Sequence, residues 1–498
     1  MIPVGLLQPP DRPLHVARNG AAVAADLNLD ELFTVMAAGD EFVASVVRAV
    51  VPASLTDIEI IRYRQGVLAN FSAEPEMLRA LYAVATEATT VRRWMVGRGR
   101  APRSKLGLAL QPLEALVGQL RRLRQTCEKY AGACSSDGLV RFRELMTDML
   151  DDDYLAGLET HLAALYFDDG VQFSAALGPG NKADRIVLHE PPRDAKRSLF
   201  GRRSGATFEA TSDFELPDDP LSAVVEPALD TVAEVVSGAT DRVQDFFRHL
   251  RTELAFYLGC LNLRERLGRT GTPMCYPVPV PGAPALRCRD LRDAALCLSS
   301  ADVVGNDVEA AGVTFFVVSG ANSGGKSTFL RSVGTAQLMM QAGMFVTAAD
   351  FGADVRNGVF THFVRAEDPD MEHGRLDEEL ARMRELTEAL RPGGMLLCNE
   401  PFASTNDREA AAIADPIMSA LLDSGAKVVL VTHLYDFVRQ RYAAGRDTDL
   451  FLRAQRAADG RRTYRVAAGA GAPEATSHGE DIYARVFGER LPGDPAGD

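Results

Sequence analysis

The chain has 498 residues, of which 46% are hydrophobic and 24% are charged, and its formal net charge at pH 7 is −14. This length exceeds one ordinary domain and predicts two or three hydrophobic cores. The sequence contains no run of about 18 uninterrupted apolar residues, so we expect no membrane span. The surplus of acidic side chains argues against a protein whose whole surface attracts DNA.

The N-terminus and the cysteines both bear on the cellular compartment. Residues 1–13 lack the basic start and apolar centre of a secretory signal, so we expect none. The seven cysteines include no Cys-x-x-Cys pair, which argues against a zinc site and against a disulfide framework. These features predict a cytoplasmic protein with reduced thiols.

The first half of the chain has a helical pattern. Apolar residues recur at three- and four-residue spacing over 26–166 and again over 221–268. Around 170–215, short apolar runs separated by Gly and Pro predict strands. A segment dense in Pro and Gly over 271–284 marks a domain junction. We therefore expect a mainly α-helical region up to this junction.

From about residue 285, strands alternate with helices. Apolar runs at 313–319, 395–398 and 427–432 each lead into a helical stretch. Continuous apolar strands in this alternation predict an α/β fold with a mostly parallel sheet that is covered on both faces.

The segment after the first of these strands fits the G-x-x-x-x-G-K-[ST] pattern of a phosphate-binding loop. Its glycines let backbone N–H groups surround phosphate oxygens, Lys326 neutralises phosphate charge and Ser327 offers a hydroxyl to Mg²⁺. The helix that follows directs its N-terminal dipole at the anion. The alternative is a chance Gly-rich turn, but the flanking strand and helix favour a nucleotide site. We assign the nucleotide to Gly320, Asn322, Ser323, Gly324, Gly325, Lys326, Ser327 and Thr328.

Two later strands end in polar residues. The strand at 395–398 is followed by Asn399 and Glu400. This position suits a metal-side residue and then a general base, so we expect Asn399 beside the magnesium and Glu400 at the attacking water. An Asp would be expected in place of Asn399, and the amide brings no negative charge. The strand at 427–432 leads to His433, which we predict to sense the γ-phosphate. The alternative is that these residues are solvated strand ends.

Together these motifs resemble the MutS family of DNA mismatch repair ATPases. The similarity covers the loop and helix at 319–331, the segment 336–348, the pair Asn306-Asp307, the stretch 400–405 and Thr432-His433. It is strong over 300–440 and weaker over 55–70 and 240–270, where the family has its core and lever helices.

The resemblance implies an ABC-type P-loop ATPase domain of α/β fold, preceded by a mainly α-helical core and lever region. It also implies ATP and Mg²⁺ as cofactors, hydrolysis by Glu400 and His433, and a homodimer with composite ATP sites. Its DNA would be duplex, mismatched or branched, in mismatch repair or a related recombination process. The expected segments are a lead-in (1–25), the core and lever region (26–270), the ATPase domain (271–475) and a C-terminal helix and tail (476–498).

The chain departs from the family pattern in three places. We find no room for the N-terminal mismatch-recognition module or for the connector, and none for the nuclease-like C-terminal domain that some short relatives carry. The family's Ser-Thr-Phe segment, which reaches the partner's nucleotide, is replaced by 374–380, where Arg375 could substitute for the hydroxyls. Asn399 predicts slow hydrolysis.

Basic residues are concentrated in two segments. Nine lie within 85–124, with Glu87 and Glu114 as the acidic residues there, and a second group lies in 193–203. Basic side chains near an aromatic side chain suit contact with DNA phosphates and stacking on bases. The alternative is that both segments are solvated protein surface. The predicted DNA contacts are Arg92, Arg93, Arg98 and Arg100. Two other functions stay open: an ABC-type ATPase acting on a protein or ribonucleoprotein, and a nucleotide-switched scaffold with negligible hydrolysis.

Overall fold

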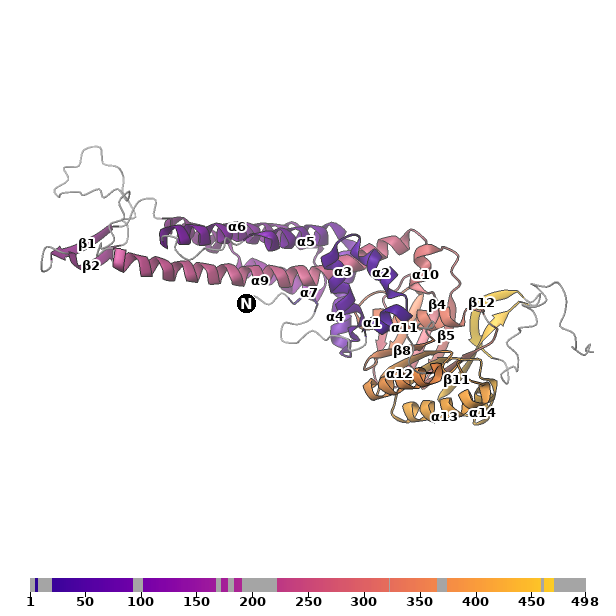
Figure 1. Cartoon of the computed structure of the whole chain (residues 1–498). Helices are drawn as coiled ribbons and strands as arrows, with labels where there is room; N and C mark the ends of the chain where they lie inside the picture. Colours follow the sequence, from indigo (N-terminus) through magenta and orange to yellow (C-terminus); the bar gives the residue numbers. More distant parts are fainter. Residues whose placement is uncertain are drawn as a thin grey trace, which may run out of the picture. The chain divides into compact units, whose positions relative to one another are not determined.

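A computed structural model describes residues 5–7, 20–92, 102–166, 172–177, 183–189, 222–321, 323–364, 374–457 and 461–469. The chain divides into two compact units (Figure 1). Unit 1 comprises residues 1–4, 80–132 and 143–251, and unit 2 comprises residues 5–79, 133–142 and 252–498. Each unit is described separately below.

Unit 1 is mainly helical, as the apolar spacing predicts. Its helices are the larger part of α5 (Pro75–Thr90), α6 (Pro102–Lys129), most of α7 (Asp137–Met149), α8 (Asp152–Ala164) and the first thirty residues of α9 (Ser222–Gly268). The short 3-10 helix η2 (Ala131–Ala133) follows α6. The strands predicted near 171 and 185 are confirmed as β1 (Gln172–Leu177) and β2 (Ala183–His189), which pair antiparallel. The strand expected at 207–210 lies outside the described residues.

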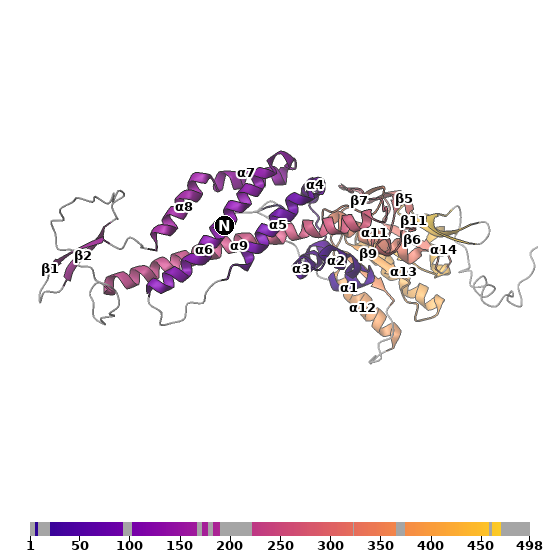
Figure 2. The same ribbon diagram turned by 90° about the horizontal axis from the view of Figure 1, so that it is seen from above.

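Helices α6 and α9 run side by side in unit 1 (Figures 1 and 2). Leucines at three- and four-residue spacing in α6, including Leu113, Leu116 and Leu120, are buried, which is the amphipathic pattern of a core-facing helix. Lys105 of α6 donates to Asp230 of α9 at 3.0 Å. An ion pair at the surface therefore joins the two helices.

Unit 2 contains short helices and two sheets. Its helices are α1 (Gly20–Asp26), α2 (Leu29–Ala37), α3 (Glu41–Val50), η1 (Val51–Ala53), α4 (Ile58–Ala73), α10 (Ala294–Ser299), α11 (Lys326–Gln341), α12 (Arg375–Ala389), α13 (Asp407–Asp423) and α14 (Tyr435–Ala443). Its strands are β3 (Val278–Val280), β4 (Ala285–Leu291), β5 (Asn306–Ala311), β6 (Phe315–Ser319), β7 (Asp350–Asp354), β8 (Val359–Phe363), β9 (Met395–Asn399), β10 (Lys427–Val431), β11 (Asp449–Arg456) and β12 (Arg462–Ala468).

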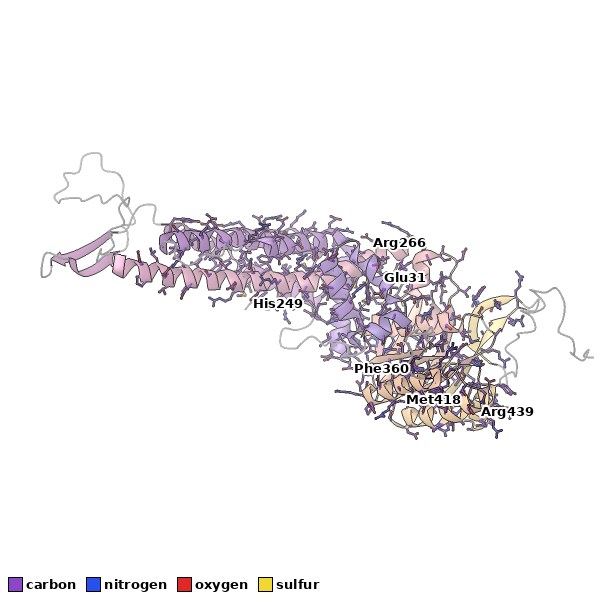
Figure 3. The ribbon with its side chains drawn as sticks, viewed as in Figure 1. Glu31, His249, Arg266, Phe360, Met418 and Arg439 are labelled. Carbon is purple, nitrogen blue, oxygen red and sulfur yellow. The ribbon has the colours of Figure 1, made fainter. Side chains whose placement is uncertain are left out.

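The larger sheet has the strand order β12-β11-β6-β10-β9-β8. The predicted parallel arrangement is confirmed from β11 to β8, whereas β12 pairs antiparallel with β11. One face packs on α12, α13 and α14, with Phe360 of β8 and Met418 of α13 (both labelled in Figure 3) in the same buried cluster. Helix α11 covers the other face, where a Cβ on Gly334 would lie 2.3 Å from Leu397. The central strands β6, β9 and β10 are buried on both faces, which accounts for their nearly continuous apolar sequences.

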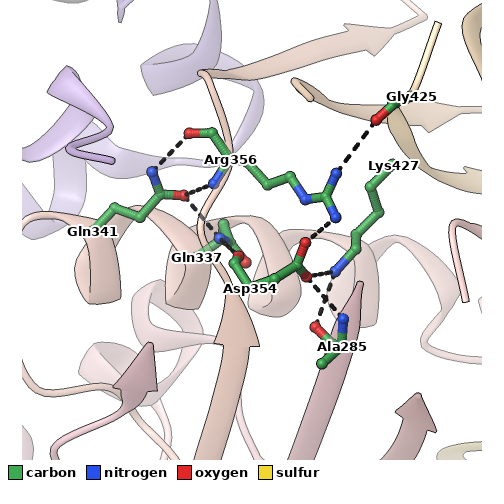
Figure 4. A network of polar contacts seen from close by, with 7 residues as sticks. All are labelled: Ala285, Gln337, Gln341, Asp354, Arg356, Gly425 and Lys427. Carbon is green, nitrogen blue, oxygen red and sulfur yellow. Dashed lines mark hydrogen bonds and ion pairs between the residues drawn. The ribbon is translucent and has the colours of Figure 1, made fainter. Parts of the chain in front are cut away.

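The smaller sheet, in the order β3-β7-β4-β5, is tied to the larger one by a buried polar network (Figure 4). Asp354, at the end of β7, accepts hydrogen bonds from the side chains of Arg356 and Lys427 and from the Ala285 amide. Lys427 begins β10 and also donates to the Ala285 carbonyl at 2.9 Å. Burial, followed by the charge of Arg356, lowers the pKa of Lys427. One carboxylate therefore serves two buried cations.

Two glutamines of α11 extend this network to the helix that follows the candidate phosphate loop. Gln337 donates to the Asp354 carbonyl at 2.8 Å and to Gln341 at 2.7 Å. Gln341 in turn donates to the Leu55 and Arg356 carbonyls, each at 2.8 Å. The polar contacts thus fix α11 against both sheets.

We predict that Asp354→Asn destabilises unit 2 much more than Lys427→Met does. The first change leaves two buried cations without their shared carboxylate, which costs about 3–5 kcal/mol. The second keeps the Asp354–Arg356 pair and leaves one carbonyl short of a donor, at a cost of about 1 kcal/mol. Urea unfolding followed by circular dichroism measures both. Equal unfolding midpoints for the two variants would contradict the role assigned to Asp354.

Candidate functional site

The loop of residues 320–325 connects β6 to α11 and contains glycines that no larger residue can replace without strain. Gly320 and Gly325 have φ angles of 111° and 96°, a region that favours glycine. A Cβ on Gly320 would lie 3.1 Å from the Ala454 amide nitrogen, and a Cβ on Gly325 would lie 3.1 Å from the Tyr464 carbonyl oxygen. Strands β11 and β12 therefore press directly on the loop.

Lys326, the first residue of α11, turns back onto the loop. Its buried ammonium donates to the carbonyls of Gly320 at 2.7 Å and Ala321 at 3.3 Å. Burial lowers the pKa of Lys326, and the negative charge of Glu400 acts in the opposite direction. The Lys326 ammonium therefore lies beside the loop, at the N-terminal end of α11. The Glu400 carboxylate is close enough to interact with it.

Ser327 and Asn399 meet across the sheet. The Ser327 hydroxyl donates to Oδ1 of Asn399 at 2.9 Å. Asn399 is the last residue of β9, and Val431 of β10 pairs with it. A hydroxyl and an amide oxygen are hard oxygen ligands of the kind that Mg²⁺ takes together with phosphate oxygens. The two side chains therefore fit a magnesium ion brought by a nucleotide, although they supply no carboxylate.

Glu400 follows β9 in a strained backbone conformation. Its φ angle is 52°, and the residue after it is Pro401, which restricts the preceding backbone further. Such a conformation costs about 1–3 kcal/mol and persists only where the surroundings fix it. The Glu400 amide donates to the Val431 carbonyl at 2.8 Å, so β10 holds the start of this turn.

Thr432 and His433 lie at the same edge of the sheet. The Thr432 amide donates to the Val318 carbonyl at 3.2 Å, and its hydroxyl accepts from the Leu434 amide at 3.1 Å. His433 is 34% exposed and its Nε2 lies 3.8 Å from Asp407 at the start of α13. The strand register thus places His433 at the sheet edge where β6 and β9 also end.

The remaining assigned residues have simpler outcomes. Ser323 is exposed, with a φ of 58°, and Gly324 is buried, with its Cβ position 2.9 Å from the Ala321 carbonyl oxygen. Thr328 is half-buried in the first turn of α11. Asn322 lies outside the described residues.

The motifs did not reveal how the loop's neighbours are held in place. Asn306, which the sequence marks only as part of an Asn-Asp pair, accepts a hydrogen bond from the Val466 amide at 2.7 Å. It therefore fixes β12, the strand that borders Gly325. Buried Glu379 of α12 accepts from the Phe402 amide just beyond Glu400. Their burial among polar partners is a tertiary property that spacing along the chain does not encode.

Much of the basic cluster within 85–124 is paired with acidic side chains inside unit 1. Arg121 contacts Glu159, Arg122 contacts Glu87, and Arg124 contacts Glu128 and Asp152. Lys105 contacts Asp230, as above. Arg92 is exposed, whereas Arg93, Arg98, Arg100 and the segment 193–203 lie outside the described residues. The positive charge that the sequence concentrates here is thus partly neutralised by folding.

The described residues also bear on metal binding and on membrane insertion. Among those residues, no group of three or more His, Cys, Asp and Glu side chains is placed to hold a metal ion. None of the helices in the described ranges combines the length and apolar character needed to cross a bilayer.

Comparison with known proteins assigns both parts of the chain to one family. Residues 56–270 match the MutS2 N-terminal domain, and residues 316–478 match MutS domain V. Curated proteins called endonuclease MutS2 are similar over shorter stretches. The protein of Anaeromyxobacter sp. (strain Fw109-5) is 35% identical over 123 residues, which are 24% of this chain and 15% of the relative.

Other relatives agree with this assignment. The Thermus thermophilus protein is 30% identical over 131 residues, covering 26% of this chain and 17% of its own length. The Pelotomaculum thermopropionicum protein is 32% identical over 162 residues, covering 31% and 20%. The aligned part of the chain spans only 15 to 20% of the length of these three relatives. With two domain matches over most of the sequence, the chain belongs to the MutS family.

Proposed function

We propose that this chain is a DNA-binding ATPase whose nucleotide site lies at the junction of β6, β9 and β10, in an ABC-type P-loop domain. The observation that carries the proposal is the 2.9 Å hydrogen bond from Ser327 to Asn399. It joins the residue after the loop lysine to the residue before the candidate base, which are 72 positions apart in sequence. That juxtaposition is what phosphoryl transfer to water requires of these side chains.

Each residue of the proposed site has a separate task. Lys326 neutralises the β- and γ-phosphates, and the loop amides hold their oxygens. Ser327 and Asn399 would hold Mg²⁺, which polarises the phosphate oxygens when bound. Glu400 orients a water and accepts its proton, and His433 contacts the γ-phosphate at the sheet edge. Tyr464 is exposed, and its backbone borders Gly325. We assign its side chain no part in these steps.

The proposal places DNA binding in the helical part of the chain and ATP turnover in the sheet domain. Its support is family membership, together with the name of the relatives, endonuclease MutS2, which describes proteins that act on nucleic acid. The same proposal includes a homodimer with composite ATP sites, a clamp that changes with nucleotide state, and a role in mismatch repair or recombination. Arg375, at the start of α12, would face the partner's nucleotide in such a dimer.

A protein or ribonucleoprotein partner is the second candidate. The observation that favours it is the internal pairing of Lys105, Arg121, Arg122 and Arg124 with acidic residues, which leaves less positive charge for phosphates. The DNA-binding measurement below separates the two candidates.

The hydrolytic role of Glu400 is tested by Glu400→Gln. The variant keeps the shape of the side chain and removes the base, so we expect turnover to fall by about 10²–10⁴-fold while ATP still binds. Phosphate release measures turnover and calorimetry measures affinity. Lys326→Ala is the matched variant: it should weaken ATP binding, because phosphate charge is left uncompensated. Hydrolysis by Glu400→Gln at the wild-type rate would assign the base elsewhere.

Asn399→Asp tests whether the missing carboxylate makes hydrolysis slow. A negative charge beside Ser327 should strengthen magnesium binding, and turnover should rise if the 2.9 Å contact is kept. A magnesium titration of ATP turnover measures both quantities. Asn399→Ala is the comparison, since it removes the oxygen without adding charge. A lower magnesium requirement together with faster turnover in Asn399→Asp supports the idea, and a higher magnesium requirement refutes it.

The predicted DNA contacts are tested with two variants, each of which loses four positive charges. Replacing Arg92, Arg93, Arg98 and Arg100 by Gln should weaken duplex binding and flatten its salt dependence, by about 0.9 in the log–log slope for each lost contact. The control replaces the paired residues Lys105, Arg121, Arg122 and Arg124 by Gln, which removes the same charge. Gel binding to homoduplex, mismatched and branched DNA measures both proteins. Equal log–log slopes for the two variants would show that the four predicted contact residues are solvated surface. If the wild-type protein binds no DNA, a protein or ribonucleoprotein partner is favoured.

A further inference from the structure

The turn after β9 contains more backbone strain than Glu400 alone. Phe402, two residues later, also has a left-handed backbone, with a φ of 62°. Bulky residues rarely adopt this conformation, because it is strained for any side chain larger than glycine. The Phe402 side chain is fully buried in the cluster beneath α12, α13 and α14. Something must hold these two strained residues in place, because the turn sets where the Glu400 carboxylate lies.

Glu379 of α12 supplies that hold. It is 5% exposed, and its Oε1 accepts from the Phe402 amide at 2.5 Å. Its other oxygen, Oε2, accepts from the Ser404 hydroxyl at 3.1 Å. The Glu379 side chain therefore binds the turn at two residues, Phe402 and Ser404, which follow Glu400 and Pro401.

Glu379 is itself held by β8. His362, 2% exposed, lies with its Nε2 3.2 Å from Oε1 of Glu379, and its ring lies 6.3 Å from the Phe402 ring. Burial acts to raise the pKa of Glu379, but the hydrogen bonds from His362, the Phe402 amide and Ser404 outweigh it, and the pKa lies below its usual range. An ionised carboxylate makes stronger hydrogen bonds than a neutral acceptor.

The chemistry of this position is hard to explain by packing alone. On α12 the neighbouring side chains are apolar: Met383 is buried in the cluster, and Leu376 and Leu380 pack against it. A buried charge contributes little net stability, and well-packed apolar residues of similar volume often replace it without loss. A carboxylate is useful here because it can accept from a backbone amide and a hydroxyl at once, which no apolar side chain can do.

We propose that Glu379 is a positioning residue for hydrolysis, which fixes the turn carrying Glu400 and so links the position of α12 to the position of the general base. The inference rests on the proposed function, because it requires Glu400 to act on ATP. Glu379 itself does not touch the nucleotide in this scheme. Its loss should therefore change the rate of the chemical step and leave nucleotide affinity intact.

The test compares Glu379→Ala, Glu379→Gln and Ser404→Ala in the full chain, with Glu385→Ala as the control from the exposed face of α12. We measure kcat and KM for ATP with magnesium, and ADP affinity by calorimetry. Glu379→Ala should lower kcat by about 10²-fold, the scale expected for a misplaced reacting group, with ADP affinity within about threefold of wild type. Glu379→Gln keeps an acceptor for the Phe402 amide and should recover most of the rate. Ser404→Ala should lose a few-fold, and Glu385→Ala nothing.

The outcomes separate this inference from the function on which it rests. Glu400→Gln is measured in parallel. If Glu400→Gln is inactive while every Glu379 and Ser404 variant turns over at the wild-type rate, the positioning role is wrong and the base assignment stands. If Glu400→Gln is fully active, or the wild type has no turnover, the proposed function fails first.

A purely structural role gives a different pattern. In that case ADP affinity and melting temperature fall together with kcat, and Glu379→Gln offers no recovery, which would overturn the proposal. Should Glu379→Ala not fold, Glu379→Gln and Ser404→Ala decide. Wild-type rates in both overturn the proposal, and a loss in kcat at constant ADP affinity supports it.

Discussion

The parallel pairing of β10 with both β6 and β9 is the constraint on which the candidate site depends. Phe315 to Val318 of β6 lie opposite Val428 to Val431, and β9 pairs with the same strand from its other side. Because carboxyl ends of parallel strands meet at one edge, this register brings the loop, Asn399 and Thr432 to the same edge of the sheet.

Strand β10 also connects this edge to the opposite end of the sheet. Lys427 begins the strand inside the buried network around Asp354, and the Val431 carbonyl ends it by accepting from the Glu400 amide. The glutamines of α11 belong to the same network, so the helix that starts at Lys326 is fixed at its far end as well. Polar contacts thus hold both ends of β10, whose middle residues are apolar. A rigid scaffold of this kind suits a site that must hold charged groups in place.

How much of this could be predicted from the sequence depends on the range of the interaction. The strand–loop–helix around Lys326 and the apolar strands before Asn399 and Thr432 are local patterns, and the structure has them where the spacing indicates. The sequence motifs assigned both Ser327 and Asn399 to the magnesium, and the two side chains do lie in contact. The strand order of the larger sheet was not predictable from the sequence. No motif indicates that β11 pairs with β6 or that Ala454 packs against Gly320.

Long-range pairings account for the remaining differences. The segment 85–124 reads as a basic surface because the acids that neutralise it, such as Asp230 and Glu159, lie far along the chain. Glu379 reads as one more acid on a charged helix, and only folding places it in an apolar cluster beside a strained turn.

The two buried carboxylates show how one fold can use the same chemical group in different ways. Asp354 accepts hydrogen bonds from both Arg356 and Lys427, so it serves the packing of sheet against sheet. Glu379 has no arginine or lysine among its hydrogen-bond partners in the described structure, and it is ionised because an amide, a hydroxyl and an imidazole donate to it. Hydrogen bonds of this sort depend steeply on distance and angle, whereas attraction between charges falls off slowly. A carboxylate held by directed donors is therefore the better device for fixing a turn, and it is the one that lies next to Glu400.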